Sequence, residues 1–398
     1  MVYFLPELVE AVLGHIDKEN ELLEARHICS VVSRTWSSAA RPPLFSEVHL
    51  NNKSLSPETD RGVISSRILA ESPHTLKWIN KLVLSASLDV PNSILADVAR
   101  ATTNLQSFNL SQETPTDSNL DRDFASALPN TLSSIRLTTI SLFGIRNFPI
   151  QLFRHCIVLG HLTIKDCTFY SAKETPNILP ATPKPHLRFL LVSTPAHQHS
   201  INILEWLLTP HCPFDLSQLQ VLFVADRSGQ LNAYDVVCQF VSMVSSTLKH
   251  LFLDPIAALD ESSFSLFPAA NLLNLQTLEV SITQREGGHD AQWAVYCLSH
   301  LPRPRMLACL VLHYGTTDNL YTSEFDQLAT QVSSSPFDKL HIRILLHHDL
   351  PMRTVYMHVR ILSLIFKSSP SKLRMTHVRS PRGLYTNHIS LPQWPSSL

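Results

Sequence analysis

The chain has 398 residues, of which 44% are hydrophobic and 16% charged, and its formal net charge is -1. This composition is typical of a folded protein with a sizeable core and excludes a disordered chain. A charge near zero offers no basic field to a phosphate backbone, so nucleic acid is not an expected partner. No apolar run approaches the roughly 20 residues that span a bilayer, and no membrane partner is expected.

The amino-terminal residues lack the basic start and continuous apolar core of a secretory signal. We therefore expect the chain in the cytoplasm, the nucleus or both.

Residues 5–45 carry a dense helical pattern. The segment opens on Leu5-Pro6-Glu7-Leu8, where proline suits the first turn of a helix. Apolar residues then recur at helical spacing up to Ile16 and again from Leu22 to Val32. Val32-Ser33-Arg34-x-Trp36 and a final Leu44-Phe45 follow. So short a module buries too little surface to be stable alone, so we expect its apolar face to meet a partner.

This order of residues resembles the F-box, the motif by which receptor subunits of ubiquitin ligases dock onto a Skp-type adaptor. The resemblance implies that the adaptor links the chain to a cullin-RING ligase. The periodicity by itself leaves open a helical cap that packs on the rest of the same chain. The residues expected to supply the adaptor contact are Leu5, Pro6, Leu8, Val9, Val12, Leu13, Ile16, Val31, Val32 and Trp36.

The rest of the chain repeats a Leu-x-x-Leu-x-Leu pattern ten times, at intervals of 26–32 residues. This interval is near the roughly 20–29 residues of leucine-rich repeats, which place one strand and one helical segment in each unit. A set of unrelated strand–helix units in an open α/β domain is the alternative. The predicted anchors are Ile79/Leu82/Leu84, Leu105/Phe108/Leu110, Leu132/Ile135/Leu137, Leu159/Leu162/Ile164, Leu187/Leu190/Val192, Leu219/Leu222/Val224, Leu248/Leu251/Leu253, Leu275/Leu278/Val280, Leu307/Leu310/Leu312 and Phe337/Leu340/Ile342.

The expected fold is α/β: a three-helix F-box-like module followed by a curved leucine-rich-repeat solenoid. We place the module at 1–46, the solenoid at 47–379 and a tail at 380–398. Val48 and Leu50 alternate with polar residues, as in a first strand. Helices are expected around 94–99, 203–207, 236–244 and 325–332, and loops at 51–60, 112–123 and 168–186.

Residues that alternate with the anchors point to the opposite, concave side of the strands. The pattern predicts an exposed apolar centre with cationic groups on both sides, which indicates a protein target with acidic or phosphorylated flanks. The alternative is that the tail covers this centre through Tyr385, Leu391 or Trp394. The expected target-binding residues are Arg136, His161, Lys165, Phe189, Leu191, Val221, Phe223, Phe252, His313, Lys339, His341 and Arg343.

No catalytic motif is present. The chain contains neither G-x-x-x-x-G-K-[ST] nor G-x-G-x-x-G, H-E-x-x-H or G-x-S-x-G. Its seven cysteines show no C-x-x-C spacing and suit a reducing compartment, and His197-x-His199 and His347-His348 are better explained as exposed polar residues than as metal ligands. We therefore expect no cofactor, no metal and no intrinsic activity.

Together these patterns indicate the substrate-recognition subunit of a Skp-cullin-F-box ubiquitin ligase, in which the repeats capture a protein target. The alternative is a non-ligase interaction scaffold whose F-box-like helices cap the solenoid.

Overall fold

Parallel strands joined by helical segments make up the part of the chain that the computed structural model describes. This part divides into two units, Met1–Ser217 and Gln218–Leu398. The F-box-like segment, the expected helix at 94–99 and the tail lie outside the described residues. The described residues are 46–50, 73–85, 102, 104–112, 122–170, 184–194, 203–226, 231–254, 261–283, 290–315, 322–333, 337, 340–348, 360–362 and 373–379.

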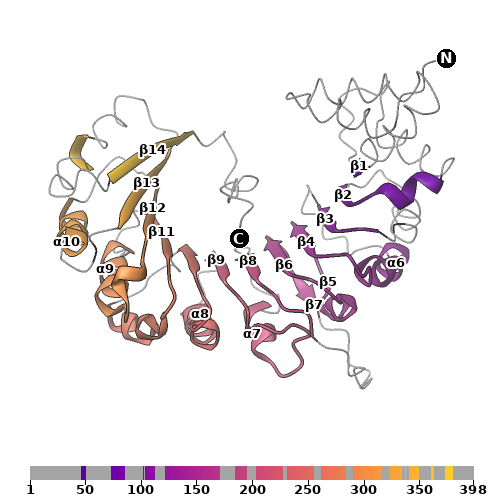
Figure 1. Ribbon diagram of the computed structural model, residues 1–398, viewed down its shortest axis with the longest axis horizontal. Helices are drawn as coiled ribbons and strands as arrows, with labels where there is room; N and C mark the ends of the chain where they lie inside the picture. Colours follow the sequence, from indigo (N-terminus) through magenta and orange to yellow (C-terminus); the bar gives the residue numbers. More distant parts are fainter. Residues whose placement is uncertain are drawn as a thin grey trace, which may run out of the picture. The chain divides into compact units, whose positions relative to one another are not determined.

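The first unit holds six parallel strands in the order β1-β2-β3-β4-β6-β8 (Figure 1). The strands are β1 (Glu47–Leu50), β2 (Lys81–Ser85), β3 (Ser107–Ser111), β4 (Thr139–Phe143), β6 (His161–Lys165) and β8 (Phe189–Thr194). Two short strands, β5 (Phe148–Pro149) and β7 (Phe169–Tyr170), pair with each other. The helical segments are η1 (Pro73–Trp78), α6 (Arg122–Leu132), η2 (Ile150–His155) and α7 (Ile203–Leu208).

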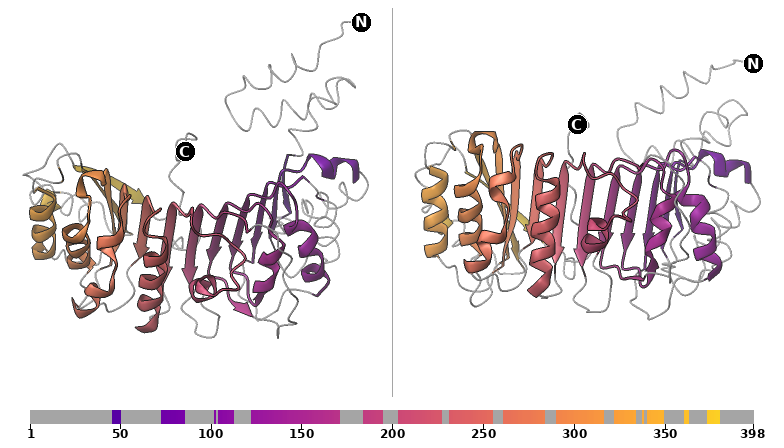
Figure 2. Two further views of the ribbon diagram at one scale, coloured as in Figure 1. Left: turned by 60° about the horizontal axis from the view of Figure 1, so that its bottom comes forward. Right: turned by 90° about the horizontal axis from the view of Figure 1, so that it is seen from below.

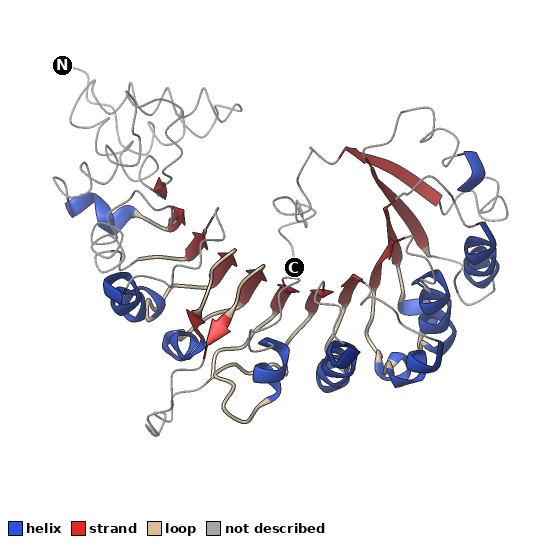
Figure 3. Cartoon of the chain, turned by 180° about the vertical axis from the view of Figure 1, so that it is seen from behind, coloured by secondary structure: helices blue, strands red, loops and turns tan. Residues whose placement is uncertain are grey.

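The second unit holds six parallel strands in the order β9-β10-β11-β12-β13-β14. They are β9 (Val221–Asp226), β10 (His250–Asp254), β11 (Thr277–Thr283), β12 (Cys309–Gly315), β13 (His341–His348) and β14 (Leu373–Arg379). The connecting helices lie on one side of these strands (Figure 3). They are α8 (Leu231–Val244), η3 (Glu261–Leu266), η4 (Ala269–Asn271), α9 (Asp290–His300), η5 (Pro304–Met306) and α10 (Thr322–Ser333).

The leucine anchors form the core, as the repeat pattern predicts. Leu105, Phe108 and Leu110 are fully buried in the second repeat, and Leu278 is fully buried in the eighth. The turn before each strand is tied to the previous repeat, because the Gln276 N–H donates to the Lys249 carbonyl and the Ala308 N–H to the Gln276 carbonyl. These bonds satisfy backbone groups that packing would otherwise leave unpaired.

Short polar side chains add to this link between repeats. The Asn104 amide donates to the Lys77 carbonyl at 2.8 Å, and the Asn274 amide donates to the Ser246 carbonyl at 2.6 Å. Both asparagines stand directly before a buried leucine that leads into a strand. The repeats therefore use side-chain hydrogen bonds at corresponding positions in the two units.

The third predicted repeat was placed five residues too early. The strand is β4, and its buried anchors are Leu137, Ile140 and Leu142. Ile135, a predicted anchor, is 73% exposed in the turn before the strand. The two overlapping patterns share Leu137, and pairing with β3 decides between them.

The tenth predicted repeat was placed two residues too early. The β12 anchors Leu310 and Leu312 pair with Ile342 and Ile344. Besides the short strands β5 and β7, two described strands fall outside the ten predicted repeats: β1, which Val48 and Leu50 had indicated, and β14, which had not been expected. The helices at 203–207, 236–244 and 325–332 are confirmed by α7, α8 and α10.

The two insertions predicted as loops each contain some regular structure. Helix α6 begins at Arg122, inside the expected loop at 112–123, and β7 lies inside the expected loop at 168–186. No helix in the described part of the chain is long and apolar enough to cross a membrane.

Candidate functional site

The side chains that alternate with the anchors share one face of the second-unit sheet. Register pairs align Phe223, Phe252, Glu279, Val311 and Arg343 in one row across β9 to β13. Neighbouring strands lie about 4.8 Å apart, so the members of the row follow one another across the face in sequence order. Figure 2 shows these strands side by side from two directions. The row forms the centre of the candidate binding face.

The two aromatic side chains of this row are buried. The Phe223 and Phe252 ring centroids lie 5.5 Å apart, and the Phe252 ring meets the His313 ring edge-on at 5.3 Å. Phe223 is 4% exposed and Phe252 8% exposed. Val221, the next predicted apolar residue on β9, is half-buried. The expected exposure of Phe223 and Phe252 was therefore wrong: the two rings pack on each other and belong to the core.

A polar cluster lies beside these rings. The His313 Nε2 and Glu279 Oε1 atoms are in close polar contact, and both side chains are mostly buried. Because β11 and β12 pair Ser281 with His313, the two partners are diagonal neighbours on the face. Burial lowers the pKa of His250, Lys249 lowers it further, and Glu279 opposes both. His250 is thus favoured in its neutral form inside this cluster.

The cationic side of the face is formed by β13. His341 is exposed and Arg343 is half-buried. The Arg343 Nε atom is buried and has no hydrogen-bond partner among the described residues. Lys339, the third predicted cation here, lies outside the described residues. Arg343 therefore has one guanidinium donor that the described residues leave unused.

The first-unit face carries a second set of aromatic and cationic side chains. Lys165 Nζ lies 5.5 Å from the centroid of the Phe143 ring, and the His161 and Phe189 rings lie 5.8 Å apart. Phe189 is 9% exposed and Leu191 2% exposed, so the expected exposure was wrong here too.

Arg136 does not belong to this face. It lies in the turn before β4, because the third repeat begins later than predicted. Ser141 and Phe143 take the face positions on β4, where their register partners on β6 are Thr163 and Lys165. The alternation rule would have found Phe143 if the repeat had been placed correctly.

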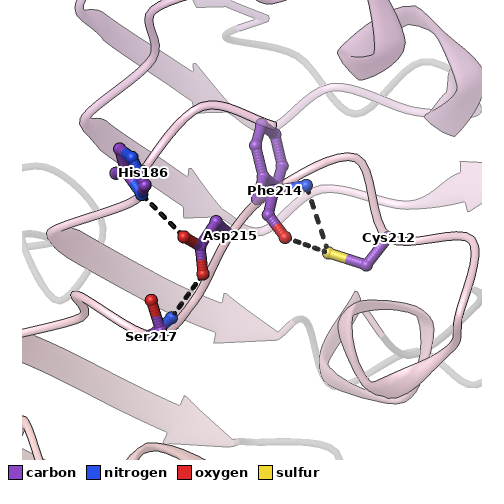
Figure 4. A network of polar contacts seen from close by, with 5 residues as sticks. All are labelled: His186, Cys212, Phe214, Asp215 and Ser217. Atoms are coloured by element: carbon purple, nitrogen blue, oxygen red, sulfur yellow. Dashed lines mark hydrogen bonds and ion pairs between the residues drawn. The ribbon is translucent and has the colours of Figure 1, made fainter. Parts of the chain in front are cut away.

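A histidine, an aspartate, a serine and a cysteine come close together near the end of the first unit (Figure 4). The His186 Nδ1 and Asp215 Oδ2 atoms lie 2.7 Å apart, and the other Asp215 oxygen accepts the Ser217 backbone N–H at 2.9 Å. The Ser217 N–H bond is the main cause that lowers the pKa of Asp215. The aspartate therefore closes a turn, and Ser217 contributes both its backbone N–H and its side chain to that aspartate.

The thiol in this network is protonated. Burial raises the pKa of Cys212, and its sulfur accepts the Phe214 backbone N–H at 3.4 Å. The thiolate is the reactive form of cysteine, so Cys212 is held in its unreactive form. Burial also raises the pKa values of Cys156, Cys167 and Cys238 to about 12. Among the described residues, no group of three or more His, Cys, Asp or Glu side chains is placed to hold a metal ion.

The predicted adaptor-binding residues, from Leu5 to Trp36, lie outside the described residues. The same holds for the His197-x-His199 pair and for the tail that was expected to cover the face. The backbone of His347-His348 lies in β13, where the two residues pair with Val378 and Arg379.

Comparison with known proteins gives structural neighbours only. No protein-family profile matches the chain, and no curated protein matches it by sequence. The crystal structure of the yeast Rad7 and Elc1 complex is similar with a TM-score of 0.41 and 13% identity, covering 95% of this chain and 98% of that chain. A protein from Bacteroides fragilis is similar with a TM-score of 0.38 and 14% identity, covering 71% of this chain and 81% of that chain.

Proposed function

We propose that this chain is the substrate-recognition subunit of a Skp-cullin-F-box ubiquitin ligase. Residues 5–45 dock the Skp-type adaptor, and the strand face of the repeats binds a protein target. The observation that carries the proposal is the succession, in one chain, of an F-box-like sequence and an array of parallel strands whose alternate side chains share a face.

The target offers acidic or phosphorylated side chains to this face. Arg343 has a guanidinium donor that no described residue uses, and His341 adds an exposed polar side chain on the same strand, β13. Arginine pairs with carboxylates and phosphates through charge-assisted hydrogen bonds. Because Phe223 and Phe252 are buried, the target binds the polar rim of the face rather than the rings.

The chemistry of ubiquitin transfer belongs to the associated cullin-RING complex, and this chain selects and positions the target. The complex acts in the cytoplasm, the nucleus or both.

The test is adaptor binding by the full chain, measured by calorimetry with a recombinant Skp-type adaptor. Leu5→Ala combined with Pro6→Ala should weaken binding, because these two residues begin the apolar stripe that is expected to contact the adaptor. Trp36→Ala should cost about 2–4 kcal/mol of binding free energy, as buried aromatic anchors do.

The matched control is Leu273→Ala combined with Pro302→Ala, two exposed positions in the repeats. The control should bind the adaptor as the unchanged chain does. Equal affinity of all variants, or no adaptor binding by the unchanged chain, would refute the ligase role and favour a scaffold.

A further inference from the structure

We propose that the turns leading into β4, β6 and β8 form a docking surface for a protein segment with a bulky aliphatic side chain flanked by Asp or Glu. Five residues define this aliphatic–arginine patch: Ile135, Arg136, Ile157, Val158 and Arg188. It lies at the edge of the first-unit sheet, apart from the strand face to which the proposed function assigns the target. It does not depend on adaptor docking.

The patch collects large apolar side chains that folding leaves in water. Ile135 is 73% exposed, Ile157 47% and Val158 39%. Single exposed apolar residues are ordinary, whereas a contiguous group rimmed by polar residues marks an interaction site. These three side chains therefore indicate an interaction site if they lie next to one another on the surface.

The backbone brings the three turns together. Ile135 stands two residues before the buried anchor Leu137, and Ile157 stands two residues before the buried anchor Leu159, so the two isoleucines occupy equivalent positions in neighbouring repeats. The Gly160 N–H donates to the Thr138 carbonyl at 2.9 Å and fixes the two turns side by side. Strand spacing of about 4.8 Å then makes the two isoleucine side chains neighbours.

The third turn adds Arg188, whose backbone N–H donates to the Gly160 carbonyl at 2.9 Å. Arg188 is exposed, and its charge helps to lower the pKa of His161, whose main cause is burial. Arg136 is exposed in the first turn, one residue from Ile135. The turns that hold the apolar group thus also hold two exposed arginines.

The charged side chains in the turns of the patch are all basic. The described residues of the three turns, 133–138, 155–160 and 184–188, include no Asp or Glu, but they include two arginines, a lysine and two histidines. The nearby Asp215 carboxylate is already engaged by His186 and the Ser217 N–H.

An occupant with acidic groups beside an apolar side chain matches both properties, because the aliphatic groups leave water and the arginines gain carboxylate partners. The chain's own residues 380–398 contain no Asp or Glu and do not fit.

The test uses a library of random dodecapeptides displayed on phage and selected against the full chain. The selected peptides are then synthesised and measured by fluorescence anisotropy. They should carry a Leu, Ile, Met or Phe flanked by Asp or Glu. Replacing both Ile135→Ser and Ile157→Ser should weaken binding by about tenfold or more.

A charge reversal separates the two properties. Arg136→Glu combined with Arg188→Glu should abolish binding of the acidic peptides, and peptides with Lys in place of Asp and Glu should then bind this variant. The matched control, Leu273→Ser with Met306→Ser, removes exposed apolar residues of the second unit and should leave binding unchanged. Thermal melting checks that each variant is folded.

Selection of no peptide that depends on the patch would overturn the proposal, as would peptides that bind equally without acidic residues. A concentration-dependent dimer that the isoleucine variant abolishes would instead assign the patch to a second copy of the chain. If the unchanged chain binds the selected peptides but not the adaptor, the proposed function is refuted and this docking surface is still supported.

Discussion

Replacing Leu251 by alanine should reveal how strongly the repeats depend on one another. Leu251 is 1% exposed, and its register partners Leu222 and Leu278 on β9 and β11 are fully buried. Burying a leucine side chain is worth about 1.5–3 kcal/mol, and the cavity left between two rigid strands adds to that cost. The expected loss of unfolding free energy is therefore about 2–5 kcal/mol.

The assay is urea unfolding followed by circular dichroism, together with hydrogen exchange read repeat by repeat. Leu273→Ala is the matched control, because the same atoms are removed from a side chain that is 40% exposed. Its effect should stay within about 0.5 kcal/mol. Exchange in the Leu251 variant should rise first in β9 and β11, because each repeat leans on its neighbours. Equal effects of the two variants, or exchange that rises only in β10, would refute the reasoning.

Two further predictions follow from pKa shifts. In a folded Cys29→Ser variant, Cys156, Cys167 and Cys238 should resist iodoacetamide at about pH 8, because a thiol with a pKa of about 12 is protonated there. The same thiols should react once urea unfolds the chain. Rapid labelling of the folded chain, measured by mass spectrometry, would contradict this. Burial lowers the pKa of His250 in the folded chain below its ordinary value of 6.5. When the pH drops below 6.5, the unfolded chain therefore takes up a proton that the folded chain does not, and the free energy of unfolding decreases as the pH is lowered. The loss between about pH 7 and about pH 5 should be smaller in His250→Gln, and equal pH profiles in urea unfolding would show that His250 is not responsible.

The repeat pattern predicted the core because leucines at a fixed interval have one physical use, which is burial between neighbouring strands. It failed where the sequence offers two overlapping patterns. Leu132/Ile135/Leu137 and Leu137/Ile140/Leu142 fit the rule equally well, and only the pairing of β3 with β4 selects the second. The misplacement then moved Arg136 from a turn onto the binding face.

Alternation along a strand predicts which face a side chain takes, but not what covers it there. Phe223 and Phe252 are on the predicted face, yet their packing against each other and against His313 depends on strand register. The Glu279–His313 pair joins residues on neighbouring strands through a diagonal contact, which a single strand pattern does not contain. Helical and strand segments were therefore predictable, while side-chain partnerships between repeats were not.

One bond passes over a whole repeat. The Trp293 indole N–H of α9 donates to the Tyr234 hydroxyl of α8 at 3.1 Å. In the repeat between them, the described helical residues form the short segments η3 and η4, and the Phe267 ring lies 4.9 Å from Trp293. Arrays of this kind change length during evolution by gaining or losing single units. Here, deleting the intermediate unit would remove the Phe267 ring, and inserting another would separate Trp293 from Tyr234. We therefore expect the segment from α8 to α9 to be kept as one block, with length variation among related chains falling outside it.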